Sequence, residues 1–240
     1  MLTRGLCLKN FRSALEADSR VVIPNILETD VAERLATCLR TELPWELAYR
    51  DARFSPEHQA QRMSQAQFKT LGPQQAAALQ TEILDQARDQ FQYLYQHFNI
   101  GEGMRSGTPP DLYVYDLLRF LQSDAFLQPA RDLTGDTALN HIFAHATLYT
   151  AGSFLKVHED IVDNADRRYA YVLGLTRGWQ ADMGGLLHFL DEDDTVTATV
   201  LPGFNTLTVF SVPARHLVSS VAPWVRNPRL AITGWLMVKA

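Results

Sequence analysis

The stretch LKVHEDIVD, residues 155–163, places His158 and Asp160 two positions apart. The run alternates as a strand does, and side chains two apart on a strand share a face, provided that the strand persists to residue 160. An imidazole and a carboxylate on one face can both ligate a metal ion. One further imidazole would complete a set of two histidines and one carboxylate, which leaves positions on iron(II) open to other molecules. The stretch therefore predicts two ligands of a metal site.

Two histidines are candidates for the third ligand. His188 lies in GGLLHFL, only 28 residues after Asp160, whereas His216 opens a later run, 58 residues after His158. A ligand from such a distant run would lie across a barrel from the first two. We favour His216 because of the arginine that follows it along the chain.

Arg229 begins the run RLAITGWLMV, thirteen residues after His216. On a strand, it shares a face with Ala231, Thr233 and Trp235. An arginine that points into a pocket is unfavourable to bury unpaired. It becomes a good receptor when it binds a carboxylate through two parallel hydrogen bonds. A metal site next to an inward arginine is what a metal-chelating dicarboxylate needs.

The composition is that of an ordinary globular protein, with 240 residues, 46% of them hydrophobic and 20% charged. The net charge of −5 gives no sign of a nucleic-acid-binding surface. Cys7 and Cys38 form no CxxC pair, which argues against a zinc finger or a disulfide scaffold and fits a reducing compartment. Neither a signal peptide nor a membrane span is apparent, so we expect a cytoplasmic protein. Nothing in the sequence indicates its oligomeric state.

Residues 1–139 have mainly helical patterns. RVVIPNIL predicts a short strand that stops at Pro24, and ETDVAERLATCLRTEL predicts a helix with Asp30 and Glu33 as its capping box. The strongest helical pattern runs from Gly72 to Phe98, with an apolar stripe that includes Leu79, Ile83 and Phe91. LLRFLQ and SDAFLQPARDLTG predict two further helices, the second capped by Ser123.

From about residue 140 the pattern changes to a period of two. Eight short runs, rich in β-branched and aromatic residues, are separated by Gly, Pro, Asn or Asp. Eight such strands predict a sandwich or jelly roll. We therefore expect an α+β protein with a mainly β core, and one domain over residues 1–240. The helices of residues 1–139 would pack outside the catalytic core of residues 140–240.

The motifs HED, GG at 184–185, His216 and RLAITGW together resemble the iron(II)- and 2-oxoglutarate-dependent dioxygenases. The stretch LYTAGSFLKVHED…RRYAYVLGLTRGW…GGLLHFL is similar to the catalytic domains of prolyl 3- and 4-hydroxylase-like proteins. The resemblance covers roughly residues 140–238 and implies a double-stranded β-helix. It implies iron on His158, Asp160 and His216.

The same resemblance implies that Arg229 holds the distal carboxylate of 2-oxoglutarate and that Tyr149 contacts this cosubstrate. Collagen-type prolyl hydroxylases have lysine at the position of Arg229, so the chain departs from them. The implied reaction hydroxylates a C–H bond with O2 and releases succinate and CO2, with ascorbate as a further candidate cofactor. A prolyl residue of a protein or peptide, a free amino acid and a small metabolite all remain open as substrates.

Other residues have weaker claims. Arg167 and Arg168 could meet a substrate carboxylate or acidic peptide, although charged residues at a turn are commonly solvated. Tyr171 could line the pocket or belong to the core. His141 and His145 lie four apart, and without an accompanying carboxylate we expect them to make structural hydrogen bonds.

Two other classes of function stay open. One is a cupin-like non-redox isomerase or small-molecule-binding module, which would use the same barrel without needing Arg229. The other is a silent scaffold, against which an intact ligand set argues.

Overall fold

The computed structural model describes residues 1–162 and 165–239. Its α-helices are α1 Arg12–Asp18, α2 Thr29–Thr41, α3 Gln65–Thr70, α4 Pro73–Asp89, α5 Ile100–Ser106, α6 Tyr113–Leu121 and α7 Asp124–Thr134. Its strands are β1 Arg20–Pro24, β2 Glu46–Arg50, β3 Ala60–Ser64, β4 Tyr93–Asn99, β5 His141–Tyr149, β6 Phe154–His158, β7 Asp166–Leu175, β8 Leu187–Leu190, β9 Val196–Val200, β10 Phe204–Ser211, β11 His216–Val218 and β12 Arg229–Val238. Each of the eight runs expected after residue 140 forms a strand.

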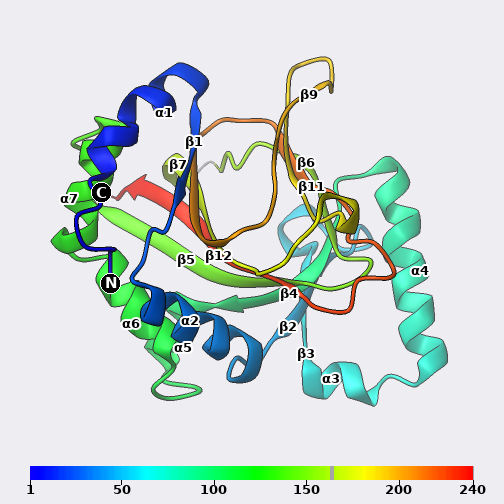
Figure 1. Cartoon of the computed structure of the whole chain (residues 1–240). Helices are drawn as coiled ribbons and strands as arrows, with labels where there is room; N and C mark the ends of the chain where they lie inside the picture. The colour runs from blue at the N-terminus through cyan, green and yellow to red at the C-terminus, as the bar shows by residue number, and fades with distance from the viewer. Residues whose placement is uncertain (163–164, 240) are drawn as a thin grey trace.

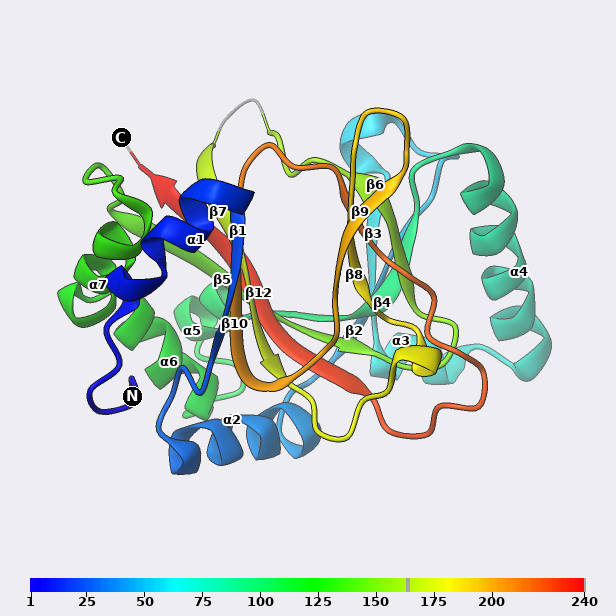
Figure 2. The same ribbon diagram turned by 45° about the horizontal axis from the view of Figure 1, so that its top comes forward.

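Within the described residues the twelve strands form one antiparallel sheet that curls back on itself (Figures 1 and 2). Along it the order is β1-β10-β7-β12-β5-β4, followed by β6-β11-β8-β9, with the hairpin of β2 and β3 attached to β4. We call the first six strands the broad side and the last four the narrow side. The two sides face each other as the layers of a jelly roll, which confirms the predicted double-stranded β-helix.

Helices cover the outer face of the broad side. α2 packs against β7, β10 and β12, and α5 packs against β4 and β5. Apolar residues of the helices, such as Leu35 and Leu39 of α2 and Leu117 of α6, join residues of this outer face of the sheet in one buried cluster. The expectation that helices lie outside the β-core is therefore confirmed for this face. Among the described residues, no helix combines the length and apolar character needed to cross a membrane.

The helix predicted from Gly72 to Phe98 is wrong in its last third, because α4 ends at Asp89 and residues 93–99 are strand β4. The buried side chain of Gln92 fixes this change: its Oε1 accepts hydrogen bonds from the backbone N–H groups of Arg50 and Tyr93, and its Nε2 donates to the carbonyl of Arg50. Pairing with β2 and β5 thus outweighs the helical pattern of the sequence.

The apolar stripe expected on this helix does not pack as one surface. In α4 only Ile83 is buried, and Leu79 and Ile83 line a groove of about 600 Å³ over the outer face of β2 and β4. Phe91 lies on the other face of the sheet, in the cavity described below. Figure 1 shows α4 at the opposite edge of the molecule from α6 and α7.

Neither predicted helix cap makes the side-chain hydrogen bond that was expected of it. α2 begins at Thr29, ahead of the expected cap, with Glu28 in the capping position and no side-chain cap bond. Ser123 does precede α7, but its hydroxyl donates to the carbonyl of Phe120 instead of accepting from the helix.

Four strands of residues 1–139 belong to the same sheet as the later strands. β1 pairs with β10, and β4 pairs with both β5 and β6. This shared sheet supports our proposal that residues 1–240 form one domain.

Candidate active site

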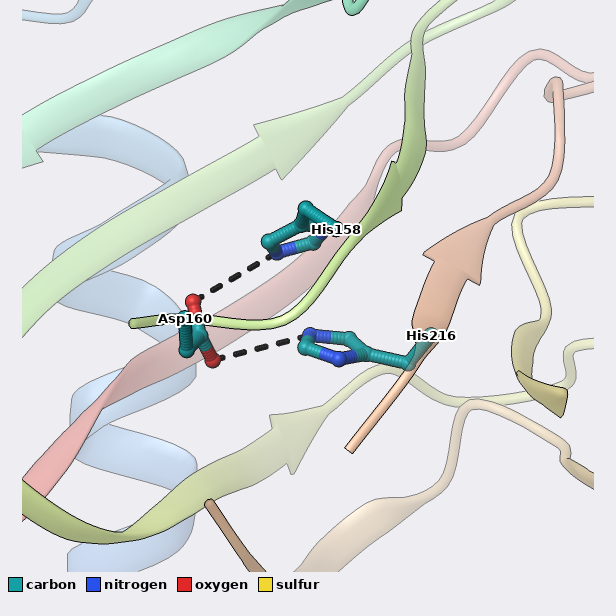
Figure 3. A group of neighbouring side chains, drawn as sticks. All are labelled: His158, Asp160 and His216. Carbon is teal, nitrogen blue, oxygen red and sulfur yellow. Dashed lines mark ion pairs between the residues drawn. The ribbon is translucent and has the colours of Figure 1, made fainter. Parts of the chain in front are cut away.

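Three side chains from the narrow side converge at one point (Figure 3). His158 ends β6 and is the direct partner of His216, which begins β11. The rings of His158 and His216 lie 4.1 Å apart, centre to centre, and Asp160 faces both, with its Oδ1 3.5 Å from His158 Nε2 and its Oδ2 3.6 Å from His216 Nε2. One ligand atom from each residue lies within 4.8 Å of the others. The structure therefore brings together the three residues predicted to bind a metal.

Asp160 reaches this position by a different route from the one expected. β6 ends at His158, and Asp160 has a φ of 61°, in the left-handed region. His158 and Asp160 therefore do not share a strand face, and the chain turns so that the carboxylate faces the Nε2 atoms of both imidazoles. Asp is among the few residues other than glycine that adopt this conformation readily.

Hydrogen bonds to the backbone orient both imidazoles. His158 Nδ1 lies 3.0 Å from the carbonyl oxygen of Lys156, and His216 Nδ1 lies 2.8 Å from that of Ala214. A carbonyl only accepts, so each Nδ1 carries the proton and donates it. Each Nε2 is then left with a lone pair that faces the other ligands, which is the usual arrangement of metal-binding histidines. The donor set therefore fits a divalent metal ion.

The protonation states also fit a cation. Burial opposes ionisation of Asp160, but the neighbouring His158 and His216 favour it in the metal-free cluster and lower its pKa to about 2. Burial, together with the neighbouring His158, lowers the pKa of His216 to about 4. At neutral pH the cluster thus offers an ionised carboxylate and a neutral imidazole of His216 as ligands.

The three residues open into a cavity of about 500 Å³ between the two sides of the sheet. Arg229 lies in its wall, only 4% exposed, and its Nε has no hydrogen-bond partner. The guanidinium lies against the ring of Tyr149, and Tyr95 stacks on Tyr149 with ring centres 5.0 Å apart. A buried cation without an acidic partner is unfavourable, so this position is prepared to receive an anion.

The double glycine at 184–185 permits the approach of a loop to Arg229. Both residues have positive φ, 67° and 62°. A Cβ on Gly184 would lie 2.0 Å from the carbonyl oxygen of Ser220, and one on Gly185 would lie 3.4 Å from Arg229 Cδ. Side chains here would therefore push apart the loops that close this end of the cavity.

A second arginine marks another part of the cavity. Arg167 places its Cζ 3.5 Å from the centre of the Trp235 ring, and its Nη1 donates to the backbone carbonyl of Asp160 over 3.1 Å. Two buried nitrogen atoms here, Nε of Arg167 and Nε1 of Trp235, lack a hydrogen-bond partner. Arg167 and Trp235 therefore line the same cavity as Arg229, at a different place.

Other sequence candidates lie elsewhere or have other partners. His188 is bonded to Thr199 and does not line the cavity, so it lies apart from His158 and Asp160. Arg168 is paired with Asp166 on the surface. Tyr171 lines the cavity, but its hydroxyl donates to the carbonyl of Phe143.

The contribution of β4 to the cavity could not be predicted from the sequence. Tyr93 and Tyr95 line the cavity, and His97, the next residue on that face of the strand, packs against His145. The alternation of Tyr93, Tyr95 and His97 was a signal for a strand, but the same run also fitted a helix. His145 makes the expected structural bond, from its Nε2 to Thr233 Oγ1 over 2.9 Å, and it lines the cavity as well.

Comparisons with known proteins agree with this geometry. Residues 144–237 match the model of the 2OG-Fe(II) oxygenase superfamily. Prolyl 3-hydroxylase sudestada1 of Drosophila melanogaster is 27% identical over 175 residues, which cover 67% of this chain and 32% of that protein. The chain therefore spans about a third of the length of this relative.

Solved structures share the fold. A prolyl-4-hydroxylase of Pseudomonas putida matches with a TM-score of 0.61 and 20% identity, covering 98% of this chain and all of that one. A prolyl hydroxylase of Trichoplax adhaerens, solved with a hypoxia inducible factor peptide fragment, matches with a TM-score of 0.64 and 16% identity, covering 96% and 89%.

The fold and the family match are those of a 2OG-Fe(II) oxygenase domain. Over residues 144–237 the chain matches the 2OG-Fe(II) oxygenase superfamily, and it is similar to prolyl hydroxylases. The match implies Fe(II), 2-oxoglutarate and O2 as the participants in its chemistry.

Proposed function

We propose that this chain is an iron(II)- and 2-oxoglutarate-dependent dioxygenase that hydroxylates a C–H bond and releases succinate and CO2. One observation carries the proposal. The Nε2 atoms of His158 and His216 converge with the Asp160 carboxylate, and the same cavity contains the buried Arg229, whose Nε has no hydrogen-bond partner. A site for a metal and a site for an anion thus open into one enclosed volume.

Each residue then has a defined task. His158, Asp160 and His216 hold iron(II), and their three ligand atoms leave the remaining positions on the metal free. Arg229 binds the distal carboxylate of 2-oxoglutarate, with Tyr149 fixing the guanidinium from one side. Bound iron would supply the redox chemistry that uses O2 as the oxidant: one oxygen atom enters succinate as 2-oxoglutarate loses CO2, and the other converts C–H to C–OH. The aromatic walls keep bulk water away from this region.

We propose a prolyl residue of a protein or peptide as the substrate. Two hydroxylases with the same fold are prolyl hydroxylases, one of them solved with a peptide fragment. In this chain the partnerless Arg167 Nε and Trp235 Nε1 are both obligate donors, so they favour a ligand with carbonyl oxygens. The flat Trp235 ring beside them suits an apolar ring such as that of proline.

The non-redox alternative has less support, because a cupin-like isomerase does not require a buried arginine facing the metal site. A role for ascorbate and a cytoplasmic location stay predictions. The acidic-peptide role suggested for Arg168 loses its support, since Asp166 already pairs with that side chain.

Anaerobic titration with iron(II), followed by 2-oxoglutarate, tests the proposal. We expect a weak visible charge-transfer band that needs both additions, and succinate release once air is admitted. Arg229→Ala should bind iron(II) but develop the band only at much higher 2-oxoglutarate concentrations. The proposed activity would be refuted by an absorption band that depends on neither iron(II) nor 2-oxoglutarate. It would also be refuted if no succinate were released.

A further inference from the structure

Two buried histidines lie side by side on neighbouring strands of the broad side. His145 on β5 and His97 on β4 have ring centres 4.9 Å apart, with 37° between the ring planes. They are 9% and 7% exposed, and in neither ring does the buried Nδ1 have a hydrogen-bond partner. Buried polar atoms are nearly always hydrogen-bonded in folded proteins, so two adjacent exceptions call for an explanation.

The surroundings of His145 fix its ring. Its Nε2 is bonded to Thr233 Oγ1 over 2.9 Å, and Phe143 and Trp235 each place a ring centre 5.7 Å from its own. His145 and Thr233 both line the cavity that contains the metal-binding residues. Thr233 is four residues from Arg229 and two from Trp235, so the imidazole lies between the anion site and the Arg167–Trp235 pair.

Both imidazoles are uncharged at neutral pH. Burial, aided by the neighbouring His145, lowers the pKa of His97 to about 2. Burial also lowers the pKa of His145 to about 4, against the opposing charge of Asp160. A neutral imidazole has one N–H group and one lone pair. The pair can therefore offer a donor and an acceptor, as the tautomers adjust.

Charged ligands fit this place less well. The nearby Asp160 carboxylate is shared by the two metal-binding imidazoles, and Arg62, on β3, already pairs with Glu102 over 3.3 Å. A cation in contact with Phe143 and Trp235 would lose hydration without gaining an ion pair there. An anion would lose hydration too, and it could pair with Arg167, whose Nη1 is already bonded to the carbonyl of Asp160. An amide offers both an N–H group and a carbonyl, and loses less on burial.

We propose that His97 and His145 form a substrate-binding subsite, which we call the imidazole pair, for a neutral amide group of the substrate. His145 makes the direct hydrogen bond through Nδ1, and His97 positions its ring from behind. The pair thereby determines specificity for an amide-linked residue over a free amino acid. This inference rests on the proposed function only in taking the cavity as the substrate site.

Three small probes that share one ring test the proposal. They are N-acetyl-L-prolinamide, which is neutral, N-acetyl-L-proline, which is an anion, and L-prolinamide, which is a cation at pH 7. The protein is loaded with Zn(II) and 2-oxoglutarate, so that no turnover occurs, and its histidines are labelled with ¹⁵N. We expect the neutral probe to shift the His145 Nδ1 resonance and to bind about tenfold more tightly than either charged probe.

Variants separate hydrogen bonding from packing. His145→Phe keeps a ring but removes both nitrogens, and should weaken the neutral probe about tenfold while the charged probes change little. His145→Asn places an amide near the position of Nδ1 and should restore part of the affinity. His188→Gln, on the same protein but outside the cavity, is the control and should bind like the unaltered chain. Thermal melting of each variant confirms that it is folded.

Several outcomes would overturn the imidazole pair as an amide site. They are the absence of any shift or saturation with N-acetyl-L-prolinamide, equal binding of the three probes, and unchanged affinity in His145→Phe. Preference for the anion would assign this end of the cavity to Arg167 instead. Uncoupled succinate release is measured separately with iron(II), so a failed amide site and a failed oxygenase assignment give different results.

Discussion

The Arg229 guanidinium lies over the ring of Tyr149, with Cζ 4.9 Å from the ring centre. The two residues face each other directly across β12 and β5, and both are buried. Burial lowers the pKa of Arg229 and raises that of Tyr149 to about 12, and the arginine partly opposes the second shift. The guanidinium is therefore positioned by the Tyr149 ring and by the pairing of β12 with β5. N–H groups that these contacts do not use can bind a ligand.

Replacing Arg229 tests its role as the cosubstrate receptor. Arg229→Lys keeps the charge but loses one of two parallel hydrogen bonds, each contributing roughly 1.5–3 kcal/mol. We expect the KM for 2-oxoglutarate to rise about tenfold or more. Arg229→Ala should raise it further, because the distal carboxylate would then be unpaired in a partly dry pocket. Succinate release against 2-oxoglutarate concentration, at saturating iron(II), provides the measurement.

Arg226 is the matched control, because it lies three residues earlier and is exposed. Arg226→Ala should leave the KM for 2-oxoglutarate unchanged. If both Arg229 variants kept the original KM, the anion would have to bind elsewhere in the cavity.

Removing a predicted metal ligand should abolish turnover but keep the fold. His158→Ala, Asp160→Ala and His216→Ala each delete one of three converging ligand atoms. None of the three belongs to the large apolar cluster that stabilises the broad side. We expect loss of tight Mn(II) binding, measured by electron paramagnetic resonance, with the far-ultraviolet circular dichroism spectrum preserved.

His188→Ala provides the comparison, since His188 is bonded to Thr199 outside the cavity. It should bind Mn(II) and turn over like the unaltered chain. Full activity in any one of the three ligand variants would remove that residue from the proposed set.

The buried His145 should make stability depend on pH. Its pKa is lowered from 6.5 to about 4, so below pH 6.5 the unfolded chain takes up a proton that the folded chain does not. This part of the stability is complete above pH 6.5 and falls until pH 4 is reached. Between pH 7 and pH 5 the loss is about 2 kcal/mol, at about 1.4 kcal/mol per pKa unit.

Urea unfolding of the metal-free protein at the two pH values measures this effect. His145→Phe should lose about 2 kcal/mol less stability than the unaltered chain on going from pH 7 to pH 5. Because His97 and His216 also have lowered pKa values, some pH dependence should persist in the variant. An identical pH dependence in both proteins would mean that His145 is not held neutral.

Deleting residues 1–100 should give insoluble protein. The deletion removes β1 and β4, which pair with β10, β5 and β6, and it uncovers the face that α2 buries. Large apolar side chains contribute about 1.5–3 kcal/mol each when buried. Expression of residues 101–240, with the supernatant assayed for protein and for succinate release, is the test. A soluble, active fragment would show that the core folds without these strands.

Single substitutions refine the same point. Leu35→Ala in α2 should lower the free energy of unfolding by about 2–5 kcal/mol, because Leu35 is fully buried. Leu84→Ala in α4 is the control and should have little effect, since Leu84 is 46% exposed.

The strands after residue 140 could be predicted because their apolar residues alternate and their ends have turn residues. Residues 91–99 could not be assigned from sequence, because FQYLYQHFN fits both a helical stripe and an alternating strand. The deciding interactions are the bonds of Gln92 to Arg50 and the pairing with β5, which are distant in sequence. Local patterns carry no information about such partners.

The convergence of the three candidate metal ligands, and the inward position of Arg229, could be predicted from residue type and spacing. The position of Asp160 could not, since nothing in HED shows that the strand ends at His158 and that the next turn is left-handed. The partnerless Nδ1 atoms of His97 and His145 could not be predicted from the sequence either. They depend on two strands brought side by side by the fold.

Strand β4 pairs with β5 on the broad side and with β6 on the narrow side. A cut between α7 and β5 would therefore leave β1–β4 on one fragment and all three predicted metal ligands on the other. Only reassembly would restore the part of the cavity wall that Tyr93 and Tyr95 form. Coexpressed halves of this chain, each fused to one of two interacting proteins, would thus act as a split reporter whose succinate output records their association.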